Sequence, residues 1–316
     1  MPLWLTESDV HTSLPMSDLI SSMETALAGF SAGRVVQPVR TVIGYQPGAF
    51  FGLMPAYDPA SDLVGTKLVT VLPANLAKGL PSHQAIIALF APQTGELLAV
   101  ADGRYITEAR TAAVSAVSVR HLARADASVL ALIGSGVQAH SHLEALPLVR
   151  EFREIRVWSP TRARLEAFVA GTGGRVHAAA SAEEAVRGAD VVVLATNSAT
   201  PVIEDAWVAP GAHVIAVGAC IPTQHEVPPA LMARSMIVVD SRAAALVESG
   251  DVILSHSQQR IHAELGEIAA GTRPGRTGPE QITLFKSLGL AIEDVVSAGL
   301  AYRRALAAGR GVQVPL

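Results

Sequence analysis

The chain has 316 residues, of which 50% are hydrophobic and 16% charged, and its formal net charge is -4. This length suits two domains of ordinary size, and the mild acidity argues against nucleic acid or an anionic membrane as a partner. One cysteine, Cys220, excludes an intramolecular disulfide. The N-terminal segment lacks a basic stretch followed by an apolar run, and no long apolar span follows, so we expect a cytoplasmic protein.

The first hundred residues predict one helix and a group of strands. Apolar residues recur at helical spacing between positions 17 and 33, and Gly33 is a suitable helix end. Runs rich in β-branched residues, separated by Pro, Gly and Asp, then predict a mostly antiparallel or mixed sheet. These runs span residues 35–44, 49–57, 64–72, 84–92 and 97–103. Residues 107–123 predict a second helix with Thr107 as its N-cap.

From residue 127 onward, short apolar strands alternate with helical segments. The strand candidates are almost entirely apolar, which is typical of parallel strands covered on both faces, and they span 128–133, 154–159, 175–179, 190–196, 213–218 and 236–240. Ser159 with Pro160 predicts one helix start, and Ser181 with Glu184 predicts a capping box. Residues 283–309 predict a long amphipathic helix that packs on the N-terminal domain.

The expected fold class is therefore α/β. Residues 116–289 would form a Rossmann domain with a doubly wound sheet that binds NAD(P). Residues 1–115 and 290–316 would form a discontinuous α+β domain for substrate binding and dimerisation.

A glycine-rich turn, Gly134-Ser135-Gly136-Val137-Gln138-Ala139, joins the first of these parallel strands to a helix. The first glycine allows a tight turn, the second lets a pyrophosphate approach the backbone, and the small sixth residue allows close helix packing. The helix N-terminus offers free N–H groups to phosphates. We expect a dinucleotide site here; the alternative is a purely structural glycine turn.

The end of the second parallel strand bears on the choice of cofactor. An NAD site places Asp or Glu there, but this strand ends with Trp158-Ser159-Pro160-Thr161-Arg162. Hydroxyl groups and a guanidinium suit a 2′-phosphate, so Ser159, Thr161 and Arg162 favour NADPH over NADH. In the alternative, Ser159 only caps a helix, Arg162 is solvated, and NADH remains a candidate.

Three cations stand among apolar neighbours in the first domain: Arg40, Lys67 and Arg110. Together they suggest an anionic substrate, because a guanidinium fork fits a carboxylate. His83 is a further candidate. The alternative is that each of these side chains is solvated or structural.

Several segments resemble the ornithine cyclodeaminase/mu-crystallin family, and within it most closely the mu-crystallin-type ketimine reductases. They include "RVVQPVRT", "TKLVTVLPAN", "ITEARTAAVSA", "GSGVQAHSH", "ESGDVILS" and "TLFKSLGLAIEDVVSAG". The resemblance implies a homodimer and a substrate pocket lined by Arg40, Lys67 and Arg110, with the two arginines binding a carboxylate. It further implies that the cofactor lies along residues 134–138, residues 159–162, Thr196, Val217 to Ala219, and Leu288.

Two departures from the family pattern bear on the reaction. Cyclodeaminases of this family carry a glutamate and an aspartate where this chain has Gly52 and Cys220. Without these carboxylates, amine oxidation has no base, whereas reduction of a preformed cyclic imine needs none. Because nothing basic adjoins Cys220 in the sequence, we expect a small inert residue lining the substrate pocket rather than a reactive thiol.

The resulting expectation is an NAD(P)H-dependent reductase of cyclic ketimine acids, with Δ1-pyrroline-2-carboxylate and Δ1-piperideine-2-carboxylate as candidate substrates. No metal ion is expected in the site. The alternatives are an alanine-type dehydrogenase, an ornithine cyclodeaminase, and a non-catalytic NADPH-binding protein of the crystallin kind.

Overall fold

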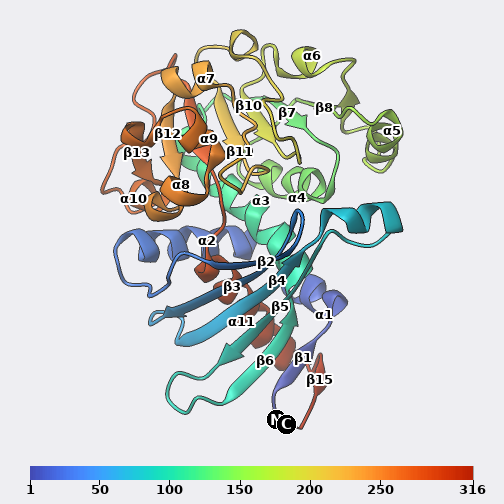
Figure 1. Ribbon diagram of the computed structural model, residues 1–316, viewed down its shortest axis with the longest axis vertical. Helices are drawn as coiled ribbons and strands as arrows, with labels where there is room; N and C mark the ends of the chain where they lie inside the picture. Colours follow the sequence, from blue (N-terminus) through green and yellow to red (C-terminus); the bar gives the residue numbers. More distant parts are fainter. Residues whose placement is uncertain (316) are drawn as a thin grey trace. The chain divides into compact units, whose positions relative to one another are not determined.

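The computed structural model describes residues 1–315, and the chain divides into two compact units. Unit 1 contains residues 1–110 and the C-terminal segment from Leu290, and unit 2 contains residues 111–289. The boundary lies within helix α3 (Gly103–Leu122), as does the boundary expected at residue 115. Unit 1 is thus assembled from the two ends of the described chain (Figure 1).

A seven-stranded sheet forms the framework of unit 1, in the order β15-β1-β6-β5-β4-β3-β2. Its strands are β1 (Leu3–Leu5), β2 (Thr41–Gln46), β3 (Ala49–Asp58), β4 (Leu63–Val71), β5 (His83–Phe90), β6 (Leu97–Asp102) and β15 (Val312–Gln313). Only β1 and β6 run parallel; the other neighbouring strands are antiparallel. The sheet is therefore of the mixed kind that the turn-separated runs predicted.

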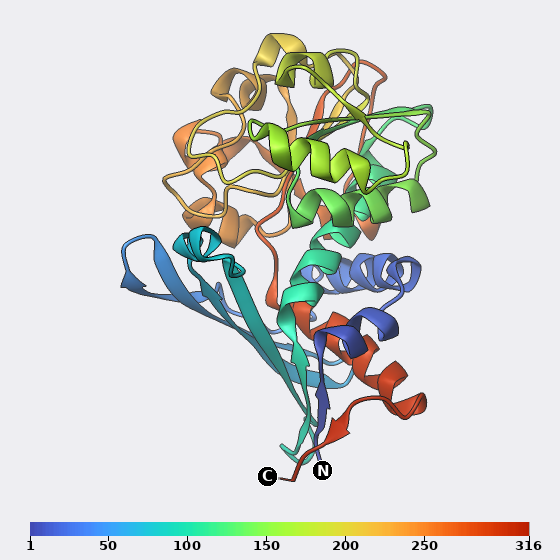
Figure 2. The ribbon, with the colours of Figure 1, turned by 90° about the vertical axis from the view of Figure 1, so that its right-hand side faces the viewer.

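Three helices cover one side of this sheet: α1 (Glu7–Ser13), α2 (Met16–Ser31) and α11 (Ala291–Ala307) (Figure 2). Gly33 adopts a positive φ of 71° just after α2, as expected for a residue that ends a helix. Gly65 of β4 lets α11 pack closely, because a Cβ there would lie 2.7 Å from the Ala88 carbonyl oxygen and 3.2 Å from Val295 of α11. This close packing brings α11 against the buried face of β4.

Helix α3 begins at Gly103, four residues before the predicted start at Thr107. Asp102 is its cap, since the Asp102 carboxylate accepts a hydrogen bond from the Tyr105 amide at 3.0 Å. The prediction of Thr107 as N-cap was wrong. The Thr107 hydroxyl instead donates to the Gly103 carbonyl at 2.7 Å, a bond that threonine makes readily inside a helix.

Unit 2 contains an eight-stranded parallel sheet in the order β13-β12-β14-β11-β10-β7-β8-β9. Its strands are β7 (Val129–Ile133), β8 (Glu154–Trp158), β9 (His177–Ala178), β10 (Val191–Leu194), β11 (His213–Ala216), β12 (Met236–Val239), β13 (Ile261–Glu264) and β14 (Thr283–Lys286). From β7 the chain builds first toward β9 and then, from β10, in the opposite direction. This reversal is the doubly wound Rossmann arrangement expected from the sequence.

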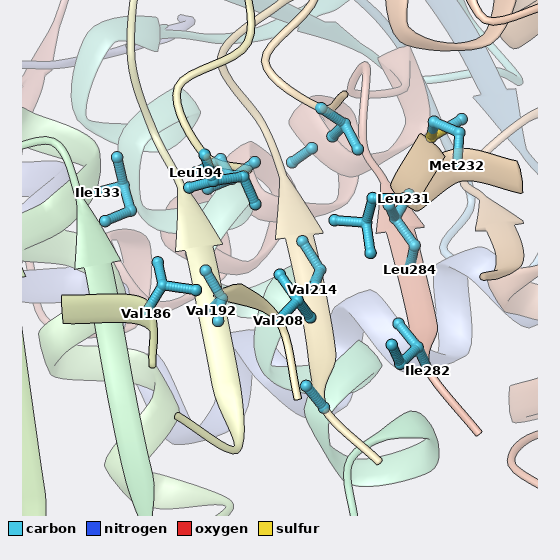
Figure 3. Packing of buried hydrophobic residues seen from close by; sticks show 14 of the residues in the cluster. Ile133, Val186, Val192, Leu194, Val208, Val214, Leu231, Met232, Ile282 and Leu284 are labelled. Atoms are coloured by element: carbon cyan, nitrogen blue, oxygen red, sulfur yellow. The ribbon is translucent and has the colours of Figure 1, made fainter. Parts of the chain in front are cut away.

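Short helices connect these strands: α4 (Val137–Ala145), α5 (Arg162–Ala170), α6 (Ala182–Val186), α7 (Pro229–Arg234), α8 (Arg242–Glu248), α9 (Gly250–Leu254) and α10 (Leu265–Ala269). Figure 3 shows apolar side chains of β7, β10, β11 and β14 projecting from one face of the sheet toward Val186 of α6 and Leu231 of α7. The strand residues in this cluster are fully buried, as befits strands covered on both faces.

The long helix predicted over residues 283–309 is wrong in its first part. Residues 283–286 form β14, which lies between β11 and β12, and the helix α11 begins only at Ala291. Four residues of strand cannot be told from a buried helical turn by periodicity alone, which explains the error.

Two predicted helix caps also differ from the structure. Helix α5 begins at Arg162 after Thr161, so Ser159 and Pro160 precede it and do not cap it. The Ser181 hydroxyl accepts from the Glu184 amide as predicted, but the Glu184 carboxylate accepts from Ala180, so the capping box is only half formed. Within residues 1–315, no helix combines the length and apolar character needed to cross a bilayer.

Candidate active site

Lys67 is a buried cation of unit 1. Alternate residues of β4 face the helical layer, and this periodicity turns Lys67 inward with only 2% of its surface exposed. The Lys67 Nζ lies 2.7 Å from Asp294 Oδ2 of α11 and 3.4 Å from Thr107 Oγ1 of α3. Burial lowers the pKa of the Lys67 amine to about 8, although the Asp294 charge opposes this shift.

Arg110 of α3 joins the same cluster. Its Nη1 lies 2.9 Å from Glu293 Oε2, and its Nε lies 3.2 Å from Asp294 Oδ1. Burial alone would raise the pKa of Asp294, but the charges of Lys67 and Arg110 hold it below its ordinary value. Asp294 therefore stays ionised and fixes both cations in position.

Arg40 and His83 complete the predicted group. Arg40 precedes β2 and is partly exposed, and its charge acts on the pKa of Lys67. His83 begins β5, and its pKa is lowered to about 4 by burial and then by the charges of Lys67 and Arg110, so its imidazole is neutral at pH 7. Unit 1 therefore brings together all four of its sequence-predicted residues.

The carboxylates of this cluster, Glu293 and Asp294, were missed by sequence reasoning. Both have fully buried side chains in the first turn of α11. The usable signal is an adjacent acidic pair inside the otherwise apolar stretch "GLAIEDVVSAG". Buried acids need a partner, and the two cations already singled out in apolar segments, Lys67 and Arg110, were the natural choice.

In unit 2 the glycine turn has the geometry that a dinucleotide requires. Gly134 has a φ of 116°, and a Cβ there would lie 2.3 Å from the Ala195 carbonyl oxygen, so no other residue fits. A Cβ at Gly136, the N-cap of α4, would meet nothing within 4 Å, which leaves the backbone open to a phosphate. The Gln138 side-chain oxygen is shielded from solvent and has no hydrogen-bond partner among the described residues.

The end of β8 carries Ser159, Thr161 and Arg162, without a carboxylate directly after the strand. Arg162 is highly exposed, with 89% of its side chain accessible, and its Nε lies 2.7 Å from Glu166 Oε1 one helical turn later. A surface pair of this kind is weak, so Arg162 can exchange it for a phosphate.

The remaining predicted cofactor residues follow neighbouring strands of the same sheet. Thr196 comes after β10, Val217 and Ala219 after β11, and Leu288 after β14. Because β14, β11, β10, β7 and β8 are adjacent and parallel, these residues and the glycine turn share the carboxyl edge of the sheet. Ligands of open α/β sheets bind at this edge, where the strand order reverses.

Cys220 belongs to unit 2 and is partly exposed, with its thiol 3.5 Å from the Val217 carbonyl oxygen. No basic residue adjoins Cys220 in the sequence, but Lys286, 66 positions later in the chain, lies near enough for the two side chains to interact electrostatically. That Cys220 is inert stays a prediction. The Lys286 Nζ is bound to Asp251 Oδ2 at 2.9 Å, and this pair is fully buried.

The sequence profile of the ornithine cyclodeaminase/mu-crystallin family matches residues 2–309. The chain belongs to this family. Among its curated relatives, the rat ketimine reductase mu-crystallin is 45% identical over 306 residues, which cover 95% of this chain and 96% of the relative.

Solved structures of other family members are similar over the full length. The Δ1-pyrroline-2-carboxylate reductase of Thermococcus litoralis, in complex with NADH and L-proline, is 37% identical with a TM-score of 0.95, covering 99% of this chain and 100% of that one. An archaeal alanine dehydrogenase dimer with bound NAD is 33% identical with a TM-score of 0.94, covering 100% of this chain and 99% of that one.

Proposed function

We propose that this family member reduces cyclic ketimine acids to cyclic amino acids with NAD(P)H, Δ1-pyrroline-2-carboxylate to L-proline being the leading case. The supporting observation is the buried cluster in unit 1, where Lys67 and Arg110 are fixed by two carboxylates. The names of the relatives agree with this chemistry, since they include a ketimine reductase and a pyrroline-2-carboxylate reductase.

The charge balance of the cluster suits a monoanionic substrate. Arg40, Lys67 and Arg110 supply three positive charges, and Glu293 and Asp294 supply two negative ones, which leaves one positive charge. His83 adds none, because its pKa is about 4. The carboxylate of the imino acid would neutralise the excess by binding to Arg40 and Arg110, since a guanidinium matches a carboxylate in shape and charge.

Lys67 is the proposed proton donor. With a pKa of about 8, its amine is protonated at neutral pH and yet releases a proton more easily than an ordinary lysine. The contacts with Asp294 and Thr107 hold the Nζ in place. Reduction of the C=N bond adds a hydride to carbon and a proton to nitrogen, and Lys67 would supply or relay that proton.

The cofactor would be held by unit 2 and supplies the hydride when bound. Gly134, Gly136, Val137 and Gln138 would contact its pyrophosphate region, and the loops after β10, β11 and β14 would contact the rest. The relatives of known structure carry NADH or NAD. We further propose a preference for NADPH in this chain, because Arg162, Ser159 and Thr161 follow β8 in place of a carboxylate.

We also propose a homodimer, supported by the exposed apolar edge of unit 1. All six residues of β2 are exposed, and β2 is the last strand of the sheet. Val42, Ile43 and Tyr45 are each about half exposed, at 51%, 52% and 45%. An open strand edge with apolar side chains is a liability in a monomer, and a second copy would cover it.

The decisive experiment follows NAD(P)H oxidation with a panel of substrates. It contains Δ1-pyrroline-2-carboxylate, Δ1-piperideine-2-carboxylate, pyruvate with ammonia, and ornithine with the oxidised cofactor. We expect turnover with the cyclic imines. Turnover only with pyruvate and ammonia would replace the proposal with an alanine dehydrogenase, and tight NADPH binding without any turnover would replace it with a binding protein.

The alanine dehydrogenase is kept as the second candidate because a structure of that name superimposes so closely. Ornithine cyclodeamination is less well supported. Gly52 and Cys220 stand where cyclodeaminases carry carboxylates, and a Cβ at Gly52 would lie only 3.0 Å from Val69 Cγ1.

A further inference from the structure

Glu226 lies in the loop after β11 and is completely buried within unit 2. One carboxylate oxygen, Oε1, accepts from the Thr196 amide at 2.8 Å and from the Thr196 hydroxyl at 2.7 Å. The other, Oε2, accepts from the amides of Gly218 at 2.6 Å and Ala219 at 3.1 Å. One side chain therefore ties the loop after β10 to the loop after β11.

Glu226 is itself fixed by a second buried carboxylate. Asp251 Oδ1 accepts from the backbone amides of Glu226 at 2.8 Å and Val227 at 2.9 Å. Asp251 Oδ2 lies 2.9 Å from Nζ of Lys286, the last residue of β14. The ends of three adjacent strands, β10, β11 and β14, are thus connected through the buried side chains of Glu226, Asp251 and Lys286.

The loops after β10 and β11 approach each other so closely at Gly218 that no side chain fits between them. A Cβ on Gly218 would lie 2.0 Å from the Thr196 carbonyl oxygen and 2.5 Å from Glu226 Oε1. Gly250, just before Asp251, is equally confined, since its Cβ would lie 1.9 Å from the Gln224 carbonyl oxygen. Such close backbone approach, at two glycines, indicates that the spacing of these loops is specified rather than incidental.

The order of strands indicates which part of the cofactor these loops meet. The adenosine ribose is expected beyond β8 and the pyrophosphate at the turn after β7, so the chain of cofactor atoms runs toward β10 and β11. Thr196, Val217 and Ala219 would therefore contact the nicotinamide half. This step rests on the proposed function.

We propose that Glu226 is a positioning residue that sets the spacing of the loops after β10 and β11 and thereby holds the nicotinamide half of the cofactor. It acts through Thr196, Gly218 and Ala219 and does not touch the cofactor itself. Asp251 and Lys286 keep it in place. Its loss would therefore weaken binding of the nicotinamide half and leave binding of the adenosine half unchanged.

The test compares NADH with ADP-ribose, which lacks the nicotinamide, by calorimetric titration of the purified full-length protein. In Glu226→Gln, an NH2 group replaces one of the two carboxylate oxygens. This group faces backbone N–H donors and cannot accept their hydrogen bonds. We expect the NADH affinity to fall roughly tenfold, the size of a lost hydrogen bond to a charged group, with little change for ADP-ribose. Titration at about pH 8 keeps the wild-type carboxyl ionised, since burial raises its pKa to about 7.

Asp190→Asn is the matched control. Asp190 is a partly buried carboxylate at the opposite edge of the sheet, and it accepts from the amides of Ser128 and Val129 and from Arg124 Nη2. This variant loses similar bonds, and both variants should unfold at lower temperature. Only Glu226→Gln should weaken the affinity for NADH more than the affinity for ADP-ribose.

The proposal would be overturned if Glu226→Gln lost affinity for NADH and ADP-ribose equally. It would also be overturned if Asp190→Asn lost affinity for NADH but not for ADP-ribose. A wild-type protein that binds neither ligand would instead refute the proposed function. Should Glu226→Gln fail to fold, hydrogen exchange of the wild-type protein supplies the test. The Gly218 and Ala219 amides lie beyond the end of β11, and fast exchange there would show that no carboxylate holds them.

Discussion

At the residue scale, the pairing of Lys67 with Asp294 determines how the substrate nitrogen could receive its proton. The amine must carry a proton to act as an acid. Because the pKa of Lys67 is about 8, the amine loses this proton as the pH rises above that value. The rate of imine reduction should therefore be constant near neutral pH and fall as the pH rises past about 8. A pH–rate profile for kcat with a saturating imine measures this limit.

Substitution of Lys67 should lower the rate of imine reduction. We expect Lys67→Met to lower kcat roughly a hundredfold or more, the usual contribution of a positioned acid, while NADH still binds. Lys78→Met, at an exposed position of the same unit, is the control and should behave as the wild type. A Lys67→Met enzyme with normal kcat and an unchanged pH profile would remove Lys67 from the proton path.

Arg162 carries the predicted preference for NADPH. Arg162→Ala should reduce kcat/KM for NADPH tenfold or more, about 1.5–3 kcal/mol for a lost charge-assisted bond, and leave kcat/KM for NADH unchanged. Arg164→Ala, two residues later on the exposed surface of α5, serves as the control. The cofactor assignment fails if the NADPH-to-NADH ratio is the same in wild type and Arg162→Ala.

Sequence reasoning found the cations of the site but not the groups that hold them. Arg40, Lys67 and Arg110 stand out because charges are rare in apolar strands and helices. Asp294 lies 184 residues from Arg110, and no local pattern carries a pairing at that distance. Glu226, Asp251 and Lys286 were missed for the same reason, since each joins a different loop or strand.

At the scale of elements, the exposed strand β2 is the proposed dimer interface. Ile43→Lys places a charge on this apolar edge and should convert a dimer into a monomer without unfolding unit 1. Size-exclusion chromatography with light scattering measures the mass. Leu148→Lys, at an exposed position of unit 2, should leave the oligomer intact. The proposal of β2 as the interface fails if Ile43→Lys remains a dimer.

Elements differed in how far their sequences predict them. Strands β7 and β10 are short runs of valine, leucine and isoleucine with at most one alanine, so pattern and structure agree. Strand β14, "TLFK", ends in a lysine and leads into a helical sequence, so its pattern suits a helix start equally well. In the structure it pairs with β11 and β12, and Asp251 neutralises the buried Lys286, a contact that the local sequence does not reveal.

At the scale of the whole molecule, buried histidines make stability depend on pH. The His142 Nδ1 lies 2.7 Å from the Gln138 carbonyl oxygen and its Nε2 lies 2.9 Å from Ser115 Oγ. A carbonyl only accepts, so Nδ1 carries the proton and Nε2 accepts. His213 is similarly enclosed by Ser118 and Thr283. Burial lowers the pKa of His142 to about 4 and of His213 to about 3.

The folded state therefore keeps these rings neutral, whereas the unfolded chain protonates them below about pH 6.5. Their contribution to stability is complete above that pH and is lost as the pH falls toward the folded values. Each histidine should cost about 1.4 kcal/mol per pH unit in this window. Thermal unfolding followed between about pH 7.5 and 5 should show Tm falling once the pH drops below about 6.5.

His142→Gln removes one titrating group, so its Tm should depend less steeply on pH than that of the wild type. His177→Gln, at an exposed position of β9, should retain the wild-type slope. A wild-type Tm that is flat across this range would contradict the assignment of the two rings as neutral.

The discontinuity of unit 1 has a consequence for how the chain matures on the ribosome. Lys67 and Arg110 are synthesised well before Glu293 and Asp294, and at about 5–20 residues per second the 184 residues from Arg110 to Asp294 take on the order of 10–40 s. Enclosing two cations without their counter-ions costs several kcal/mol per ion. Unit 1 can therefore close around Lys67 and Arg110 only after the ribosome has synthesised α11.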